Sequence, residues 1–168
     1  GKHLAALNND STEHAMVGYV LDRTMSRNGS VSRGVCTVKD GRLESIVENL
    51  KIYFEGDKVI SEIDDKKIQL TGKETVSMNL FGFSPKAFEQ FNEYWKNFIK
   101  ENVTAEKKEA LLPVVASDII RTGHGSLKVY TSEESWFGMT YPEDREVVKL
   151  EIAKKIASGY YPEKLWEK

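Results

Sequence analysis

Two strand-like segments of the sequence each contain a residue that interrupts an apolar run and has chemistry suited to binding. Gly34 lies in the segment 31–36 (VSRGVC), and Glu48 lies in the segment 46–52 (IVENLKI). A glycine inside a strand usually marks a close approach of another group to the backbone, although a β-bulge also accounts for it. Glu48 could accept hydrogen bonds from two sugar hydroxyl groups, and the alternative is an exposed charge at a sheet edge.

Two further segments place small polar or acidic residues in or just after expected strands. Ser77 and Asn79 interrupt an apolar run, where cross-strand pairing is the alternative explanation. The segment 134–144 (ESWFGMTYPED) leaves a strand and opens a helix, with Thr140 and Asp144 near the helix start. Carboxylates at a helix start also stabilise the helix dipole, so a binding role and a capping role are both open.

The sequence contains no complete motif for nucleophilic catalysis or phosphate binding. It has no Gly-x-Ser-x-Gly elbow and no Walker loop. Gly123 and Gly125 form half of a dinucleotide fingerprint, but they follow an expected helix and precede an expected strand, so we interpret them as a helix stop. His3, His14 and His124 share no metal-ligand spacing, and we expect surface or loop positions for them.

Composition limits the classes of partner. The chain has 168 residues, 40% hydrophobic and 30% charged, which fits a single globular domain over residues 1–168. The formal net charge of -2, without a basic cluster, argues against nucleic acid as a partner. Cys36 is the only cysteine, which excludes an intrachain disulfide and fits a cytoplasmic location. No apolar run approaches the roughly 20 residues of a membrane helix, so we expect no membrane partner.

Short apolar runs rich in β-prone residues predict the strands. We expect strands at 15–21, 31–38, 43–52, 76–83 and 127–130. Lys39-Asp40-Gly41 predicts a hairpin turn between the second and third of these. Residues 53–75 alternate only weakly and predict small exposed strands that form a β insertion.

Helix signals follow the strands. Ser84-Pro85 predicts a helix start, and residues 106–121 predict a helix or a pair of short helices, interrupted at Pro113. Residues 140–143 resemble a capping box, from which a helix runs to Ser158 and ends at Gly159. Strands that alternate with helices favour an α/β domain with a mainly parallel sheet and flanking helices. Binding sites in such folds lie at the carboxyl ends of the strands.

Taken together and in this order, the four segments resemble sugar-phosphate nucleotidyltransferases, the NDP-sugar pyrophosphorylases. The likeness is closest to a bacterial branch of that family. It rests on VSRGVC at 31–36, VSMNLFGF at 76–83, LLP at 111–113, WFGMTY at 136–141, GYYP at 159–162 and LW at 165–166. The resemblance covers nearly the whole chain, and the combination of motifs is specific where no single motif is.

This resemblance implies a Rossmann-like α/β/α fold with a mixed sheet and an inserted sugar-binding region. It implies the reaction of a nucleoside triphosphate with a sugar 1-phosphate, which gives an NDP-sugar and pyrophosphate in the presence of Mg²⁺. The sugar phosphate attacks the α-phosphorus of the nucleotide directly, so no covalent enzyme intermediate is needed. Catalysis then consists of positioning and of charge neutralisation at the phosphoryl group.

The resemblance also implies roles for individual residues. Gly34 matches the strand glycine whose backbone faces the sugar, and Glu48 matches the glutamate that binds sugar hydroxyls. Ser77 matches a small polar residue of the sugar pocket, and Asn79 lies close to it in the sequence. The residue after the glutamate is often lysine in the wider family, whereas this chain has Asn49, which we include among the substrate-binding candidates.

The segment 136–140 matches the part of the family that usually carries a metal-binding Asp or Asn. Trp136 joins the substrate-binding candidates, and Gly138 stands at the position of the acidic ligand. Thr140 and Asp144 are therefore the candidate ligands for Mg²⁺.

The family's glycine-rich nucleotide loop and its first metal-binding aspartate have no counterpart in this sequence. Residues 1–7 read as the middle of a helix, and the family has such a helix just after that aspartate. We therefore expect the C-terminal portion of a larger enzyme, which holds the sugar side of the site and is inactive alone. Sugar 1-phosphate and nucleoside triphosphate are the expected ligands of the parent enzyme, and exposed sheet edges favour a homo-oligomer.

Two other interpretations stay open. One is a non-catalytic binding or interaction module that shares the fold, and the other is a different α/β transferase that uses the same pocket. The sequence specifies neither the sugar nor the base.

Overall fold

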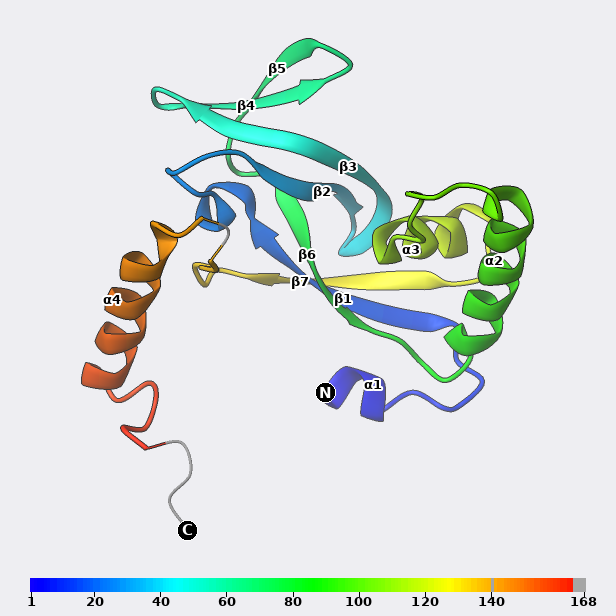
Figure 1. The fold of residues 1–168 in the computed structure, drawn as a ribbon. Helices are drawn as coiled ribbons and strands as arrows, with labels where there is room; N and C mark the ends of the chain where they lie inside the picture. The colour runs from blue at the N-terminus through cyan, green and yellow to red at the C-terminus, as the bar shows by residue number, and fades with distance from the viewer. Residues whose placement is uncertain (140, 165–168) are drawn as a thin grey trace.

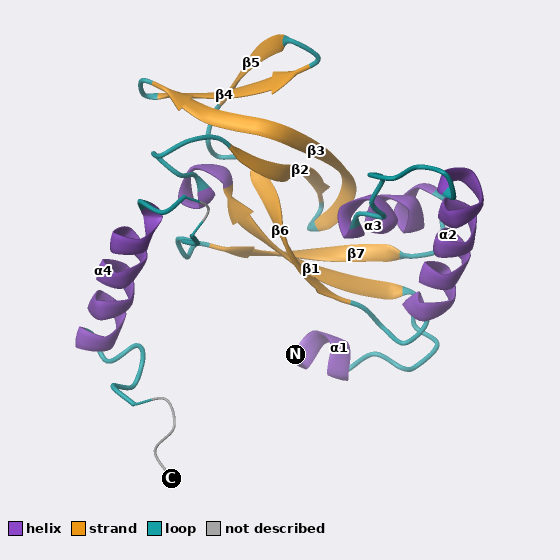
Figure 2. Ribbon diagram, viewed as in Figure 1, coloured by secondary structure: helices purple, strands orange, loops and turns teal. Residues whose placement is uncertain are grey.

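A computed structural model describes residues 1–139 and 141–164 as a mixed α/β structure (Figures 1 and 2). Its strands are β1 (Glu13–Val20), β2 (Val31–Lys39), β3 (Arg42–Glu55), β4 (Lys58–Ile63), β5 (Lys66–Leu70), β6 (Thr75–Gly82) and β7 (Ser126–Ser132). Its helices are α1 (Lys2–Ala5), α2 (Ala87–Asn102), α3 (Leu112–Arg121), α4 (Asp144–Ala157) and a 3-10 turn over Leu21–Thr24.

The strands form one sheet that closes on itself. The order is β2-β6-β1-β7-β3-β4-β5, and β2 also pairs with β3, so that β2, β6, β1, β7 and β3 form a closed barrel. Strands β4 and β5 continue the sheet beyond β3 and stand at the top of the view (Figure 1). Within the described residues, β1 and β7 are the one parallel pair, and the other pairings are antiparallel.

The mixed α/β class is confirmed, but the expectation of a mainly parallel sheet is wrong. Parallel neighbours require crossover connections, whereas the described chain between β2 and β6 runs through hairpins with no α-helix. The only long helical connection between strands of the sheet is the one from β6 through α2 and α3 to β7, within the described part of the chain. This closed, largely antiparallel arrangement does not support the Rossmann-like fold that the resemblance implies.

Two helices cover one side of the barrel. Helix α3 packs on β3, β6 and β7, and α2 packs against α3 (Figure 2). Helix α4 stands at the opposite end of the molecule, away from α2 and α3 (Figure 1). None of the helices in the described residues is both long and apolar enough to cross a membrane.

The start of α3 corrects one sequence expectation. We expected a helix from residue 106 that Pro113 interrupts, but α3 begins at Leu112 and Pro113 lies in its first turn. A proline in the first turn removes no helical hydrogen bond, because the N–H groups there have no partner within the helix. Pro113 therefore starts this helix and does not break it.

Apolar side chains form two buried clusters, which together fix the barrel and its flanking elements. One lies beneath α3 and comprises Met16, Leu43, Ala116, Leu127 and Val129. The other lies near the 3-10 turn and comprises Leu21, Val31, Ile52, Val59 and Val76. Strand β2 contributes to both, because Val31 belongs to the second cluster and Cys36 packs against the first.

His14 is fully buried in β1, which corrects the expectation of a surface or loop position. The backbone N–H of Ser84 donates to its Nδ1 at 3.2 Å, so the ring proton lies on Nε2, 3.3 Å from Oε1 of Gln90. Gln90 also donates from Nε2 to the carbonyl oxygen of His124 at 2.6 Å. These bonds tie the start of α2 to β1 and to the loop that precedes β7.

We predict that His14 makes the fold sensitive to acid. Burial lowers the pKa of His14, so the unfolded chain takes up a proton below about pH 6.5 that the folded protein does not. The stability contribution of neutral His14 is thus complete above that pH and is lost as the pH falls. Urea unfolding between pH 7.5 and 5.5 should show stability that falls with the pH, by at most about 1.4 kcal/mol per pH unit from this group.

The matched pair is His14→Gln and His124→Gln. The first should flatten the acid limb of the stability profile, and the second should leave it unchanged. An unaltered acid limb in His14→Gln would show that burial of this ring does not set the acid sensitivity.

Candidate functional site

Three neighbouring strands bring Ser77, Gly34 and Glu48 into one row. Gly34 of β2 lies opposite Glu48 of β3 on one side and opposite Ser77 of β6 on the other. The three residues are far apart in the sequence, and the closure of β2 onto both strands aligns them (Figure 1). The resemblance gave all three a place at the sugar, and the structure places them side by side.

The absence of a side chain at Gly34 keeps this row open. A Cβ at this position would lie 2.7 Å from Cγ2 of Ile46, 3.2 Å from Oε2 of Glu48 and 3.5 Å from Cβ of Ser77. The first distance is a steric clash and the second is tight, so a larger residue would push both neighbours away. The glycine thus allows close packing between the strands beside the carboxylate.

The polar groups of the row are held by local hydrogen bonds. Ser32 donates from its hydroxyl to Oε1 of Glu48 at 2.8 Å, and the backbone N–H of Asn79 donates to the Ser77 hydroxyl oxygen at 3.2 Å. Asn79 has a φ of 58°, in the left-handed region that non-glycine residues rarely adopt. Such backbone conformations cost free energy and cluster at binding sites.

A hollow of about 270 Å³ lies beside the row. The predicted substrate-binding residues that line it are Gly34, Glu48, Ser77, Asn79 and Trp136. Ser32, Arg33, Met78 and Pro113 complete the lining. Its lining includes the half-buried Glu48 carboxylate beside the small residues Gly34 and Ser77. Such a lining suits a ligand that presents hydroxyl groups.

Asn49, the remaining substrate-binding candidate, lies outside this lining. It follows Glu48 on β3 and faces the opposite side of the strand, where it pairs in register with Arg33. Its side chain is buried, and its Oδ1 has no hydrogen-bond partner within residues 1–139 and 141–164.

Trp136 lines the hollow, and it contacts Arg23, Arg33 and Gly138. Its backbone N–H donates to the carbonyl oxygen of Arg23 at 3.0 Å, and the Arg33 guanidinium carbon lies 5.3 Å from its ring centroid. A Cβ at Gly138 would lie 2.3 Å from the tip of the Trp136 ring. A side chain at position 138, where the family carries an acidic ligand, would therefore displace this tryptophan.

The described residues around the hollow include no activated nucleophile. Burial raises the pKa of the adjacent Cys36 thiol to about 12, so the thiol stays protonated and unreactive near neutral pH. No histidine lines the hollow to activate the hydroxyl of Ser32 or Ser77. The described residues around the hollow can therefore bind and orient a ligand, but they do not assemble a covalent catalyst.

Asp144 is held as a structural acceptor at the start of α4. Its Oδ1 accepts from Ser26 Oγ at 3.0 Å and from Asn28 Nδ2 at 2.7 Å, and its Oδ2 accepts from the Tyr141 backbone N–H at 2.9 Å. These bonds join the loop before β2 to the start of α4 and differ from a helix cap, because their donors lie outside that helix. Thr140, the other candidate metal ligand, lies outside the described residues.

Asp144 already uses both carboxylate oxygens in hydrogen bonds, and no preformed metal cluster surrounds it among the described residues. Mg²⁺ requires near-octahedral oxygen ligands, and it usually takes one or two carboxylates together with substrate phosphates. The described residues contain no group of three or more His, Cys, Asp or Glu side chains that could hold a metal. Asp144 instead lines a second hollow of about 210 Å³, which shares Arg33 and Trp136 with the first.

Sequence reasoning missed Arg33, although it lies within the VSRGVC motif. Its side chain is buried, Nε donates to Thr24 Oγ1 at 3.0 Å, and Nη1 donates to the Ser32 carbonyl oxygen at 2.7 Å. Nη2 donates to the Thr24 carbonyl oxygen. The available signal was an arginine in the middle of an apolar strand.

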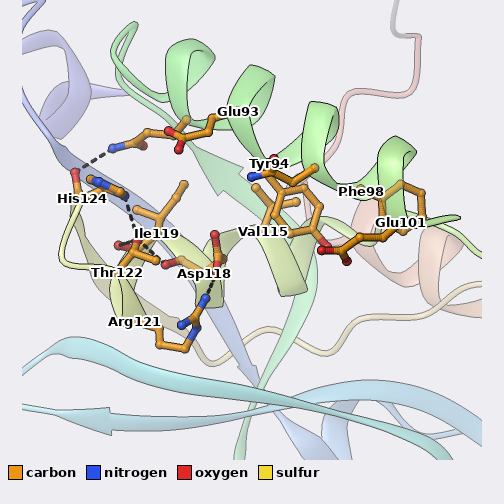
Figure 3. Close-up of a pocket in the computed structure, with 12 residues that line it drawn as sticks. Glu93, Tyr94, Phe98, Glu101, Val115, Asp118, Ile119, Arg121, Thr122 and His124 are labelled. Atoms are coloured by element: carbon orange, nitrogen blue, oxygen red, sulfur yellow. Dashed lines mark hydrogen bonds and ion pairs between the residues drawn. The ribbon is translucent and has the colours of Figure 1, made fainter.

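A further hollow of about 360 Å³ lies between α2 and α3 (Figure 3). Tyr94 and Phe98 of α2 face Val115 and Ile119 of α3 across it, as the close-up shows. Polar groups on its rim pair with one another: Asp118 with Arg121, and Thr122 with His124 at 2.8 Å. No predicted site residue lines it, so we place the candidate site at the row on β6, β2 and β3.

No protein-family model matches the chain, and no curated protein matches its sequence. A functional assignment of the chain therefore rests on the geometry of the row and its hollow.

We predict that Gly34→Ala destabilises the barrel. The added Cβ meets Ile46, and overpacking of this kind costs about 1–3 kcal/mol. Urea unfolding monitored by circular dichroism measures the loss. Thr37→Ala on the exposed part of β2 is the control and should change stability by no more than about 0.5 kcal/mol. Equal effects of the two substitutions would show that Gly34 is not closely packed.

We predict that Asp144→Ala loosens the contact between α4 and the loop before β2, in the absence of any metal. Removal of the carboxylate leaves its donors without their acceptor, which costs about 1–3 kcal/mol. Hydrogen exchange of α4 amides in EDTA-treated protein should accelerate in Asp144→Ala and stay unchanged in Glu146→Ala, an exposed carboxylate of the same helical turn. Protection that depends on added Mg²⁺ and not on Asp144 would contradict the structural role.

Proposed function

We propose that this chain supplies the sugar 1-phosphate-binding side of a nucleotidyltransferase, which makes an NDP-sugar and pyrophosphate from a sugar 1-phosphate and a nucleoside triphosphate. The observation that carries the proposal is the Ser77–Gly34–Glu48 row. The resemblance assigns all three residues to the sugar, and they lie side by side on neighbouring strands. Residues outside this chain would supply the nucleotide side.

The chemistry of the hollow supports a binding role for the sugar. The Glu48 carboxylate retains acceptor capacity beyond its bond from Ser32, so it can take hydrogen bonds from sugar hydroxyls. The Ser77 hydroxyl adds a further polar group to the same lining. Hydrogen bonds to a charged acceptor are stronger than those between neutral groups, which makes Glu48 the main determinant of affinity.

The lack of an activated nucleophile also agrees with this reaction type. In direct transfer, an oxygen of the sugar phosphate attacks the α-phosphorus, the new P–O bond forms, and pyrophosphate leaves with the electron pair of the broken bond. The role of the protein is then to hold the two substrates in line and to neutralise charge. In this scheme, Glu48 and Ser77 orient the sugar, and no step requires a covalent bond to the chain.

We predict that Glu48→Gln weakens binding of a hexose 1-phosphate. The loss of hydrogen bonds to a charged acceptor costs about 1.5–3 kcal/mol, which corresponds to roughly 10- to 150-fold in affinity. Titration of ¹⁵N-labelled protein with α-D-glucose 1-phosphate, and with other hexose 1-phosphates, gives the dissociation constants from chemical-shift changes. Glu44→Gln on the same strand removes an equal charge and should bind as the wild type does.

Saturable binding of a hexose 1-phosphate, with shifts at the row and a loss specific to Glu48→Gln, is the expected result. If no hexose 1-phosphate binds, or if Glu48→Gln and Glu44→Gln behave alike, the sugar-binding role is wrong.

A further inference from the structure

Arg33 is a buried cation without an anionic partner. Its side chain has a relative exposure of 9%, and no ion pair within the described residues includes it. A buried charge is costly unless a counter-charge or a set of hydrogen bonds compensates it. A buried charged group in the wall of a hollow is a candidate functional residue.

The hydrogen bonds of Arg33 leave part of its capacity unused. A guanidinium carries five N–H groups, and three of them donate to neutral oxygens of Thr24 and Ser32. One N–H on each terminal nitrogen therefore has no acceptor in the described structure. Burial lowers the pKa of Arg33 while the nearby Glu48 acts in the opposite direction, so the positive charge is only partly compensated.

The position of Arg33 places this charge at the candidate site. Arg33 and Trp136 line both the hollow beside the row and the adjoining hollow near Asp144, so they form the wall between the two. Arg33 is the only cationic residue in the lining of the hollow beside the row. Glu48, which accepts hydrogen bonds, lies in that same lining.

We propose that Arg33 binds the phosphate group of the phosphorylated ligand where the two hollows adjoin. This inference deepens the proposed function and rests on it for the sugar part of the ligand, but the phosphate contact is a property of Arg33 itself. A planar guanidinium with one available N–H on each terminal nitrogen is suited to phosphate oxygens. The hydrogen bonds to Thr24 and Ser32 fix its orientation in advance.

The test compares two arginine substitutions that remove the same charge. Arg33→Gln removes the buried guanidinium, and Arg121→Gln removes one on α3 that pairs with Asp118 and lines neither of the two hollows. We titrate each ¹⁵N-labelled protein with inorganic phosphate, α-D-glucose 1-phosphate and glucose. We expect Arg33→Gln to weaken both phosphate-bearing ligands at least tenfold and to leave glucose unaffected, while Arg121→Gln changes none of them by more than twofold.

Arg33→Lys guards against a folding defect in Arg33→Gln, because it keeps the charge but loses the planar fork. It should fold and bind phosphate with an intermediate loss. In the wild type, the Nε–H resonance that disappears in Arg33→Lys should shift when phosphate or glucose 1-phosphate is added. This shift requires no destabilised variant.

The outcomes separate this inference from the proposed function. If Arg33 responds to inorganic phosphate but no hexose 1-phosphate binds better than phosphate does, the phosphate contact stands and the sugar-binding role fails. If glucose 1-phosphate binds equally to wild type and Arg33→Gln, the phosphate contact is wrong and the sugar-binding role stands. Equal losses in Arg33→Gln and Arg121→Gln would show that phosphate responds only to overall charge, and would overturn the inference.

Discussion

The simultaneous pairing of β2 with β3 and β6 is the constraint on which the rest of the structure depends. A strand can hydrogen-bond to two neighbours only if both approach within the ordinary strand spacing of about 4.8 Å. At Gly34 the side chains of Ile46 and Glu48 already occupy the space that a Cβ would need. The glycine therefore permits the approach that closes the barrel, and the same closure sets Glu48 beside Ser77. Fold and candidate site share one steric requirement.

A second set of contacts connects this row to the loops around it. Arg33 precedes Gly34 on β2 and faces the opposite side of the strand. Its hydrogen bonds hold Thr24 in the turn before β2. Its guanidinium also lies near Trp136, whose segment leads from β7 to α4. Asp144 then ties the start of α4 back to the loop before β2. The loops around the candidate site are therefore connected, through these contacts, to β2 or to the loop before it. This explains why residues distant in sequence meet there.

Local sequence signals predicted the elements well, because they depend on contacts within each element. The hairpin turn at Asp40–Gly41 and the helix after Ser84-Pro85 are examples. The topology was not predictable in the same way, since strand order and direction depend on pairings between distant segments. Alternation of strands with helices favoured a parallel sheet, but β2 through β6 connect by turns, which leads to antiparallel pairing. His14 shows the same limit, because its burial depends on Gln90, which is distant in sequence.

The residues of the row were easier to single out from the sequence than the strand topology was, and the reason lies in their types. A glycine, a carboxylate and a small hydroxyl residue each interrupt an apolar strand, and such interruptions are visible in the sequence without knowledge of the pairing. Arg33 also interrupts an apolar strand, but an arginine at such a position is more readily interpreted as an exposed surface charge. Its burial places a cation in the lining of a hollow that also holds the Glu48 carboxylate. A ligand that presents both hydroxyl groups and a negative charge would find a complementary group for each in this lining.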